Sequence, residues 1–214
     1  MRGAIFDMDG LLIDSERIWQ SQWHAIAAEM GLTLPESFPD EICGTAGERT
    51  LEVLRLRFPG GDPAAIKAEC TRRVHKLEEN GVPLKPGARE ILTGLRRGGW
   101  RVALASSSPT DMIRVNLARC GIDGYFDALT SGQEVKNGKP EPDIFLLAAE
   151  KLSLPPEECY VLEDSLSGVE AGWRAHCRTI MVPDLMRPSA EARERCRFIC
   201  RDLNEAWEAI RACE

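Results

Sequence analysis

Short apolar runs alternate with amphipathic segments along most of the chain, and this pattern predicts an α/β fold. Residues 4–6 form an apolar run that predicts a buried strand ending in a polar loop. Further strands are expected at 101–105, 126–130, 160–162, 178–182 and 198–200, and helices at 88–97, 109–120, 143–151, 166–174 and 203–210. Because helices connect these strands, we expect right-handed crossovers and a doubly wound parallel sheet.

The pattern between the first strand and residue 82 is helical instead, and it contains no convincing strand. In the first helix, apolar residues recur every three to four positions, and Ser15 is the expected N-cap. An Asp-Pro pair marks the start of the third helix, with proline at its first position. The three helices are expected at 15–30, 51–58 and 62–79, with a loop containing Gly and Pro at 34–47.

Two prolines, Pro83 and Pro86, oppose both helix and sheet and mark a linker. The chain before this linker is helical, whereas strands and helices alternate after it. We therefore predict an α/β core made of residues 1–14 and 83–214. A small α-helical domain, residues 15–82, is expected to be inserted after the first strand.

The composition restricts the class of protein. The chain has 214 residues, of which 43% are hydrophobic and 29% charged, so it can bury a core and is not expected to be disordered. No apolar run approaches the roughly 20 residues of a membrane span, and the N-terminus has no signal-peptide pattern. We expect a cytoplasmic monomer with no membrane partner.

The net charge of −7, from 27 Lys and Arg against 34 Asp and Glu, opposes nucleic acid as a partner. An anionic ligand would need a local device, such as a metal ion, a helix N-terminus or a few cations. The eight cysteines are scattered, and without an exported chain we expect reduced thiols instead of a disulfide framework.

Polar side chains follow three of the predicted strands at the point where each strand ends. In an open parallel sheet, ligands bind outside the carboxyl ends of the strands, so we expect these side chains to converge. Taken singly, each segment also fits a turn, a helix cap or a surface lysine; their joint placement predicts a site. The expected residues are Asp7, Asp9, Ser106, Ser107, Glu163 and Asp164 at the strand ends, together with Lys139, which a loop in a fourth connection can direct to the same place.

The chemistry of this group favours phosphoryl transfer. Clustered carboxylates raise one another's pKa unless a cation lies among them, and oxygen ligands without histidine suit Mg²⁺. The helix that begins after Ser108 would favour an anion beside Ser106, and Lys139 would add a positive charge. A carboxylate can attack phosphorus to form an aspartyl-phosphate, and a second one can move the protons.

Four segments of the chain resemble the motifs of the haloacid dehalogenase superfamily. They match in order and spacing its phosphatase and phosphomutase branch, which has a small helical cap. These segments are residues 6–16, 105–106, 139–145 and 162–172. The resemblance covers nearly the whole chain, with the predicted insertion at 15–82 in the position of the cap.

The resemblance implies specific roles for the carboxylates. Asp7 is expected to be the nucleophile and a magnesium ligand. Asp9 is expected to be the general acid and base, with its backbone carbonyl on the metal ion. Asp164 is the expected direct ligand of Mg²⁺, with Glu163 as a further ligand or as its support.

The resemblance also indicates which residues bind the phosphate and which lie at the hinge of the cap. Ser106, Ser107 and Lys139 are expected to hold the phosphoryl group of a small phosphorylated metabolite. Asp14 and Ser15 would stabilise the hinge where the cap begins. Closure of the cap would exclude water from the site.

Substrate recognition is expected in the cap. The candidate residues are Trp19 on the first helix and Gly44, Thr45 and Arg49 in and after the cap loop. Arg49 could meet an anionic or hydroxyl group of a sugar or polyol phosphate, or it could be a solvated helix-start residue. Trp19 could wall the entrance or belong to the core of the cap.

The type of reaction depends on departures from the mutase pattern. Mutases similar to β-phosphoglucomutase carry a histidine where this chain has Trp19, and lysine and arginine around the cap-loop glycine. Here Cys43 precedes that glycine, and Gly47 occupies the arginine position. These departures favour a phosphatase, with a β-phosphoglucomutase-like phosphomutase as the alternative. Asp9 and the Glu163-Asp164 pair oppose a dehalogenase.

Another class of protein shares the acidic pocket. In a signalling receiver domain, an aspartyl-phosphate is a regulatory mark instead of a turnover intermediate. The expected acceptor, Asp7, follows the first strand instead of a middle one, and an inserted cap has no role in such a domain. An inactive ligand-binding relative is a third possibility, which the intact motif residues oppose.

Overall fold

The computed structural model of the chain describes residues 2–43, 45, 47–79 and 81–213. In this part of the chain, six parallel strands form one sheet in the order β3-β2-β1-β4-β5-β6. The strands are β1 (Gly3–Phe6), β2 (Arg101–Ser106), β3 (Ala128–Ser131), β4 (Cys159–Glu163), β5 (Arg178–Met181) and β6 (Phe198–Ile199). The predicted parallel sheet is confirmed.

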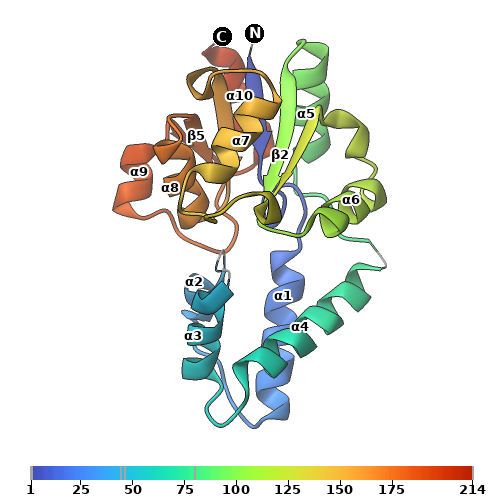
Figure 1. Ribbon diagram of the computed structural model, residues 1–214, viewed down its shortest axis with the longest axis vertical. Coiled ribbons are helices and arrows are strands. Elements are labelled where there is room, and N and C mark those ends of the chain that lie inside the picture. Colours follow the sequence, from blue (N-terminus) through green and yellow to red (C-terminus); the bar gives the residue numbers. More distant parts are fainter. Residues whose placement is uncertain (1, 44, 46, 80, 214) are drawn as a thin grey trace.

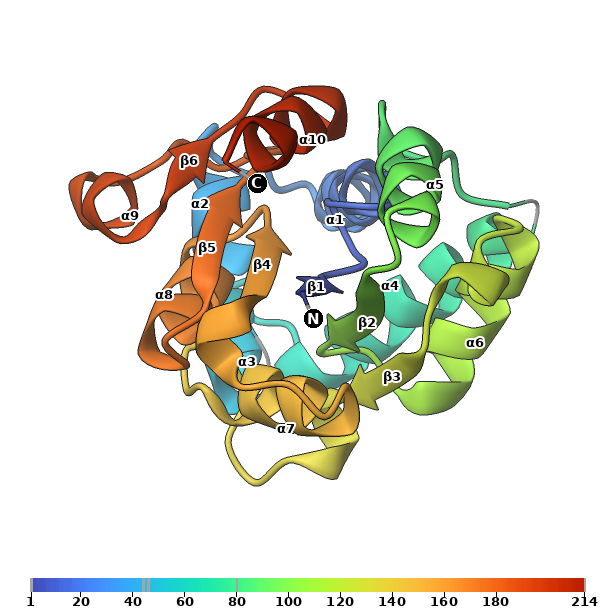
Figure 2. The same ribbon diagram turned by 90° about the horizontal axis from the view of Figure 1, so that it is seen from above.

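Helices cover both faces of the sheet (Figure 2). Those on one face are α5 (Ala88–Arg97), α6 (Thr110–Arg119) and α10 (Leu203–Ala212); those on the other are α7 (Asp143–Lys151) and α8 (Leu166–Arg174), with α9 (Ala190–Arg195) beside α8. Side chains alternate across a strand, so Phe6 packs with the first group and Ile5 with the second. This double burial explains why the strands are continuously apolar. The doubly wound arrangement is confirmed.

Between β1 and β2 the chain forms four helices that lie beyond the carboxyl ends of the strands (Figure 1). They are α1 (Glu16–Glu29), α2 (Phe38–Ile42), α3 (Gly47–Arg57) and α4 (Pro63–Glu78). These helices have an apolar cluster of their own, in which the ring centroids of Trp23, Phe38 and Phe58 lie 6.4 to 6.5 Å apart. This arrangement fits the expected insertion, whose bounds at 15 and 82 stay a prediction.

Most predicted elements agree with the structure. Helices α5, α7 and α8 begin and end at the predicted residues, and Asp62 caps α4 by accepting a hydrogen bond from the backbone N–H of Ala64 at 3.0 Å. The prediction of a loop at 34–47 was wrong, because Phe38 and Ile42 lie one turn apart and are both buried by the short helix α2. Helix α9 was missed because its sequence is mostly charged and only Ala192 is buried. Three 3₁₀ turns, at Asp123–Tyr125, Gly132–Glu134 and Pro156–Glu158, complete the described elements.

The chain passes between the sheet and the α1–α4 helices in two neighbouring segments, around Asp14 and around Lys85. The backbone N–H of Asp14 donates to the carbonyl of Pro83 at 2.9 Å, and that of Lys85 donates to Leu12 at 2.9 Å. The buried Asp184 carboxylate accepts from Arg17 at 2.8 Å and from Lys85 at 2.7 Å. These bonds hold the base of the helices over the sheet edge. None of the helices described is both long enough and apolar enough to span a bilayer.

The aromatic cluster of the α1–α4 helices predicts the effect of truncating Phe58, which is 0% exposed. Phe58→Ala leaves a cavity beside Trp23 and Phe38, and should lower the free energy of unfolding by about 3–5 kcal/mol. Leu56→Ala near the end of α3, where the side chain is 69% exposed, should change it by less than about 0.5 kcal/mol. Urea unfolding followed by circular dichroism measures both, and equal effects would contradict the proposed packing.

Candidate active site

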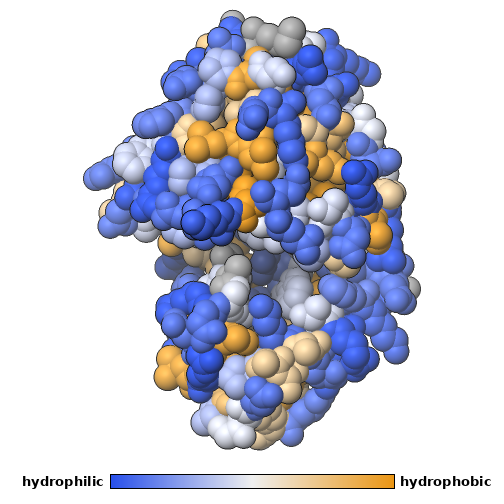
Figure 3. All heavy atoms as spheres, viewed as in Figure 1, coloured by the Kyte–Doolittle hydropathy of each residue, from blue (hydrophilic) through white to orange (hydrophobic). Residues whose placement is uncertain are grey.

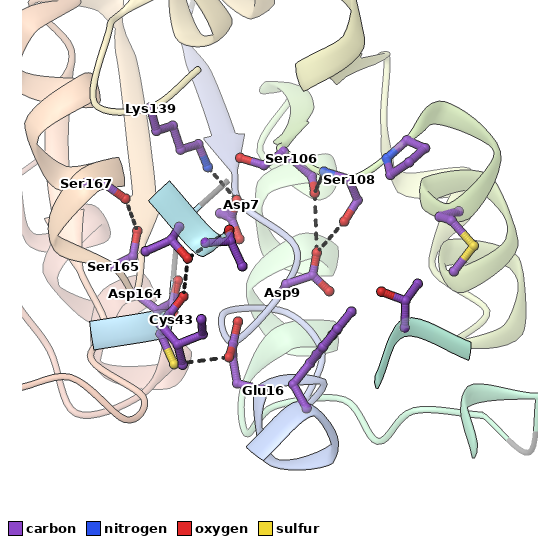
Figure 4. Close-up of a pocket in the computed structure, with 18 of the residues that line it drawn as sticks. Asp7, Asp9, Glu16, Cys43, Ser106, Ser108, Lys139, Asp164, Ser165 and Ser167 are labelled. Atoms are coloured by element: carbon purple, nitrogen blue, oxygen red, sulfur yellow. Dashed lines mark hydrogen bonds and ion pairs between the residues drawn. The ribbon is translucent and has the colours of Figure 1, made fainter. Parts of the chain in front are cut away.

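The loops that follow β1, β2 and β4 meet at one edge of the sheet (Figure 4). Strand β1 lies between β2 and β4, so the crossovers leave it in opposite directions and open a crevice at this point. The backbone N–H of Asp7 still donates to the carbonyl of Leu162 at 3.1 Å, which places Asp7 beside the end of β4. The convergence predicted from the strand ends is therefore present.

Lys139 lies buried between two carboxylates at this edge. Its Nζ is 2.5 Å from Asp7 Oδ1, 2.5 Å from Glu163 Oε1 and 3.4 Å from the carbonyl oxygen of Ala105. The ring of Phe145 lies below it, with the centroid 5.1 Å from Nζ. Burial by itself would lower the pKa of Lys139, but the charges of Asp7 and Glu163 raise it above its ordinary value. The side chain is therefore a permanent cation.

Glu163 is 0% exposed, and hydrogen bonds occupy both of its oxygens. Oε1 contacts Lys139, and Oε2 accepts from the backbone N–H groups of Asp164 at 3.0 Å and Ser165 at 3.1 Å and from Ser165 Oγ at 2.9 Å. A Cβ at Gly168 would overlap the Glu163 carboxylate, so the glycine makes room for it. Of the two roles that the resemblance allows, this position fits support of the site and not direct ligation of a metal ion.

Asp9 is held by hydroxyl groups. Its Oδ1 accepts from Ser15 Oγ at 2.8 Å, and its Oδ2 accepts from Ser108 Oγ at 2.9 Å and more weakly from Ser106 Oγ at 3.4 Å. Ser15 occupies the N-cap position of α1, as expected, but its hydroxyl makes no cap bond there and binds Asp9 instead. Ser108 was predicted only as a helix start.

Asp7 and Asp164 face the cavity beside each other. Burial raises the pKa of Asp7 to about 8, and Lys139 only partly opposes this rise. Burial and the charges of Glu163 and Asp7 also raise the pKa of Asp164. Gly10 has a φ of +82°, and a Cβ there would overlap the Asp164 carboxylate, so the glycine is required by both backbone and space.

The carboxylates at this edge of the sheet differ in how well they suit a metal ion. No three Asp, Glu, His or Cys side chains of the described ranges form a ligand group. Asp7 and Asp164 nevertheless suit a hard cation. Burial and neighbouring negative charges raise the pKa values of both carboxyl groups, and a bound cation would offset the repulsion between their charged forms. With Glu163 occupied, the residues that fit Mg²⁺ are Asp7 and Asp164, together with the backbone oxygen of Asp9 that the resemblance implies.

A cavity of about 510 Å³ separates this edge of the sheet from the α1–α4 helices. Figure 3 shows the surface hollowed between these two parts of the molecule. From the sheet side it is lined by Asp7, Asp9, Ser106, Ser107, Ser108, Pro109, Met112, Asn116, Lys139, Asp164, Ser165 and Ser167. From the helical side it is lined by Glu16, Trp19, Trp23, Ile42, Cys43, Thr45, Gly47, Thr50, Lys67, Thr71, His75 and Glu78.

The residues predicted for substrate recognition have different positions. Trp19 and Thr45 line the cavity, and Thr45 Oγ1 donates to the carbonyl of Ile42 at 2.7 Å. Arg49 is exposed, pairs with Glu52 at 3.0 Å and does not line the cavity. Gly44 lies outside the described residues.

Several lining residues lie outside the set of predicted site residues, on the third predicted helix of the insertion and on α6. Lys67, Thr71, His75 and Glu78 recur every three to four positions on α4, on a different stripe from its buried apolar residues. This polar periodicity was the available signal. Asn116 on α6 gave no local signal, because a polar residue on the buried side of a helix is visible only when its surroundings are known.

Glu16 closes the cavity beside Cys43, whose Sγ donates to Glu16 Oε2 at 3.2 Å (Figure 4). Burial raises the pKa of Glu16 from 4.5 to about 7, and the nearby carboxylates of Asp9 and Asp184 add to the rise. Burial also raises the pKa of the Cys43 thiol far above its ordinary value, so this thiol is not a nucleophile at neutral pH.

Comparison with known proteins defines the class. Residues 4–182 match the family described as haloacid dehalogenase-like hydrolase, and the chain belongs to this family. It is 36% identical to hexitol phosphatase B of Escherichia coli over 206 residues, which cover 94% of this chain and 89% of that protein. It is 35% identical to a phosphorylated carbohydrates phosphatase of Thermotoga maritima, with 80% of each chain covered.

A solved structure from Thermotoga maritima, provisionally described as a β-phosphoglucomutase, has the same fold. It is 28% identical to this chain, covers 99% of each chain and gives a TM-score of 0.79. The expected superfamily and its branch are therefore confirmed.

The raised pKa of Glu16 predicts a pH-dependent stability. The folded chain holds this proton more tightly than the unfolded chain, so the contribution of Glu16 to stability falls as the pH rises from about 4.5 through about 7. Glu16→Gln removes this effect. Relative to the unaltered chain, its free energy of unfolding should therefore rise by up to about 3 kcal/mol between pH 5 and pH 8.

Urea unfolding at both pH values, in the presence of EDTA, measures this difference. Glu36→Gln is the matched control, because the Glu36 side chain is exposed. Its difference from the unaltered chain should be equal at the two pH values. A pH-independent difference for Glu16→Gln as well would refute the assignment.

Proposed function

We propose that the chain is a magnesium-dependent phosphatase that hydrolyses a sugar or polyol phosphate through an aspartyl-phosphate. One observation carries this proposal: Lys139 Nζ lies 2.5 Å from Asp7, at the mouth of a cavity that also receives Ser106 and Asp9. A cation, a hydroxyl and two carboxylates then surround the position of one phosphoryl group. The names of the two phosphatase relatives support the same class of substrate.

Binding of the phosphoryl group would use groups that already face the cavity. Lys139 offers a fixed positive charge, and Ser106 offers a hydroxyl whose oxygen accepts from the backbone N–H of Ser108 at 3.1 Å. Ser107 lies between Ser106 and Ser108 in the sequence and also lines the cavity. These groups would hold the phosphorus within reach of Asp7.

In the first step, a carboxylate oxygen of Asp7 attacks phosphorus. A bond forms between this oxygen and phosphorus, and the bond from phosphorus to the ester oxygen breaks. Asp9 donates a proton to the departing oxygen, which leaves as an alcohol. Lys139 balances the charge of the phosphoryl oxygens during this transfer.

In the second step, water attacks the phosphorus of the aspartyl-phosphate. Asp9 accepts a proton from this water, the bond between Asp7 and phosphorus breaks, and inorganic phosphate leaves. Ser15 and Ser108 orient the Asp9 carboxylate in the resting site, at 2.8 and 2.9 Å. When bound by Asp7 and Asp164, Mg²⁺ would offset the repulsion between these carboxylates and the phosphate.

We further propose that residues 15–82 act as a cap that closes over the site. The α1–α4 helices supply one wall of the cavity, and the two crossings at Asp14 and Lys85 would be its hinge. Closure would exclude water from the first step. That the chain acts as a cytoplasmic monomer stays a prediction.

The lining residues favour a phosphatase over a phosphomutase. Trp19 lies in the cavity where the mutases carry a histidine, and Arg49 points to Glu52 instead of the cavity. A mutase must hold a second phosphoryl group; the helical side of the cavity offers Lys67 and His75 there, without the histidine and arginine positions of the mutase pattern.

The experiment that tests the proposed function measures phosphate release from a panel of phosphomonoesters with Mg²⁺. β-Glucose 1-phosphate is included and followed for glucose 6-phosphate in the presence of a bisphosphate activator. Isomerisation with little free phosphate would identify a mutase.

Asp7→Asn should lower phosphate release by at least about 10³-fold, because the amide is a poor nucleophile. Circular dichroism should show an unchanged fold. Asp123→Asn, at an exposed position far along the chain, is the control and should keep full activity. Appreciable turnover by Asp7→Asn would rule out the nucleophile assignment.

Asp164→Ala should raise the Mg²⁺ concentration needed for half-maximal activity by about 10–100-fold, because one carboxylate ligand is lost. Titration of Mg²⁺ by calorimetry measures the same loss without turnover. Asp123→Ala should leave both titrations unchanged. If Asp164→Ala also does so, Asp164 is not a metal ligand.

A further inference from the structure

A second polar pair lies in the cavity away from the phosphoryl site. Glu78 is at the end of α4 and Asn116 is on α6, and each is 3% exposed. Both side chains line the cavity. Helices α4 and α6 lie on the β2–β3 side of β1, whereas β4 and α8 lie on the other side (Figure 2).

One side-chain atom of the pair has no partner. Asn116 is close enough to Glu78 to lower its pKa through a side-chain hydrogen bond, although burial raises that pKa to about 7. The Asn116 Oδ1 atom is buried and has no hydrogen-bond partner within the described part of the chain. A buried polar atom without a partner is costly and requires an explanation, such as a ligand that is bound in the working protein.

A hydrogen bond to its backbone carbonyl holds Glu78 in place. The Arg119 guanidinium donates to the carbonyl oxygen of Glu78 at 3.2 Å, which ties the end of α4 to α6. The Glu78 side chain is therefore held between the inserted helices and the sheet layer. A ligand that contacts both Glu78 and Asn116 would span these two parts of the molecule.

The chemistry of the pair selects hydrogen-bond donors. The amide donor of Asn116 is already used by Glu78, so the pair offers acceptors: Asn116 Oδ1 and the free lone pairs of the Glu78 carboxylate. A hydroxyl group fits these acceptors, and it can also accept from Glu78 when that carboxyl holds a proton, because burial raises the pKa of Glu78 to about 7. Asp9 and this pair line the same cavity, so one small molecule can reach both sites.

We propose that Glu78 and Asn116 form the subsite that binds hydroxyl groups of the polyol part of the substrate. This inference rests on the proposed phosphatase function and deepens it. The phosphoryl group binds at Lys139 and Asp7, and the carbon chain extends past Asp9 to the pair. The pair thereby distinguishes a polyhydroxylated ester from an alkyl ester of the same length.

Two esters with the same carbon chain test the subsite: a hexitol 6-phosphate and n-hexyl phosphate, which has no free hydroxyl. Asn116→Leu keeps the volume of the side chain but removes Oδ1, and Glu78→Gln keeps the shape but removes the charge. For Asn116→Leu, kcat/KM for the hexitol ester should fall about 10–100-fold, and for n-hexyl phosphate it should change less than about twofold. Glu78→Gln should show the same selective loss, to a smaller extent.

Matched controls are present in the chain. Glu79→Gln makes the same change at the next residue, which is exposed, and Asn204→Leu makes it at an exposed position on α10. Neither should change the ratio of the two kcat/KM values. If Asn116→Leu does not fold, as judged by circular dichroism, Glu78→Gln decides the question.

Each other outcome has a defined meaning. Equal losses on both esters would show a structural role and overturn the subsite, as would no loss on either. An unaltered chain that does not prefer the hexitol ester would also overturn it. If the unaltered chain hydrolyses no phosphomonoester, the proposed function fails and the subsite with it. If it hydrolyses them and the variants show no selectivity, only the subsite fails.

Discussion

The ion pairs of Lys139 with Asp7 and Glu163 are the interaction on which the site depends. Two carboxylates that are buried side by side repel each other and are poorly solvated, and a cation placed between them offsets both costs. Glu163 cannot turn away, because its second oxygen is bound by the loop that follows β4. The lysine therefore ties together β1, β4 and the segment before α7.

This arrangement uses a property of the sheet itself. Strands β1 and β4 are adjacent in space but distant in sequence, so the loops that follow them can each supply a carboxylate to one crevice. The buried sheet makes these positions rigid. The opposite wall of the cavity comes from the α1–α4 helices, which share only two backbone crossings with the core. The groups proposed to react thus lie on the sheet, and those proposed to face the rest of the substrate lie mainly on the α1–α4 helices.

The polar lining of the cavity is divided in the same way. Near Lys139 the lining offers a cation and hydroxyl donors, which suit a phosphoryl group. Near Glu78 and Asn116 it offers acceptors, which suit hydroxyl groups. A molecule that matches both ends carries one phosphate and several hydroxyls. The phosphorylated-carbohydrate relatives of this chain are consistent with such a molecule.

Sequence alone determined most elements and the residues of the candidate site. Strand and helix periods are local, so the ends of α5, α7 and α8 could be predicted to the residue, and polar residues after strands and in one further connection indicated Asp7, Asp9, Asp164 and Lys139. The partners of each side chain were decided by tertiary structure. The Ser15 hydroxyl binds Asp9 instead of a backbone N–H of α1, and Glu163 binds Lys139 through one oxygen and its own loop through the other. The pairing of Glu78 with Asn116 joins an inserted helix to the sheet layer, and no local pattern encodes a contact between elements that meet only after both have packed.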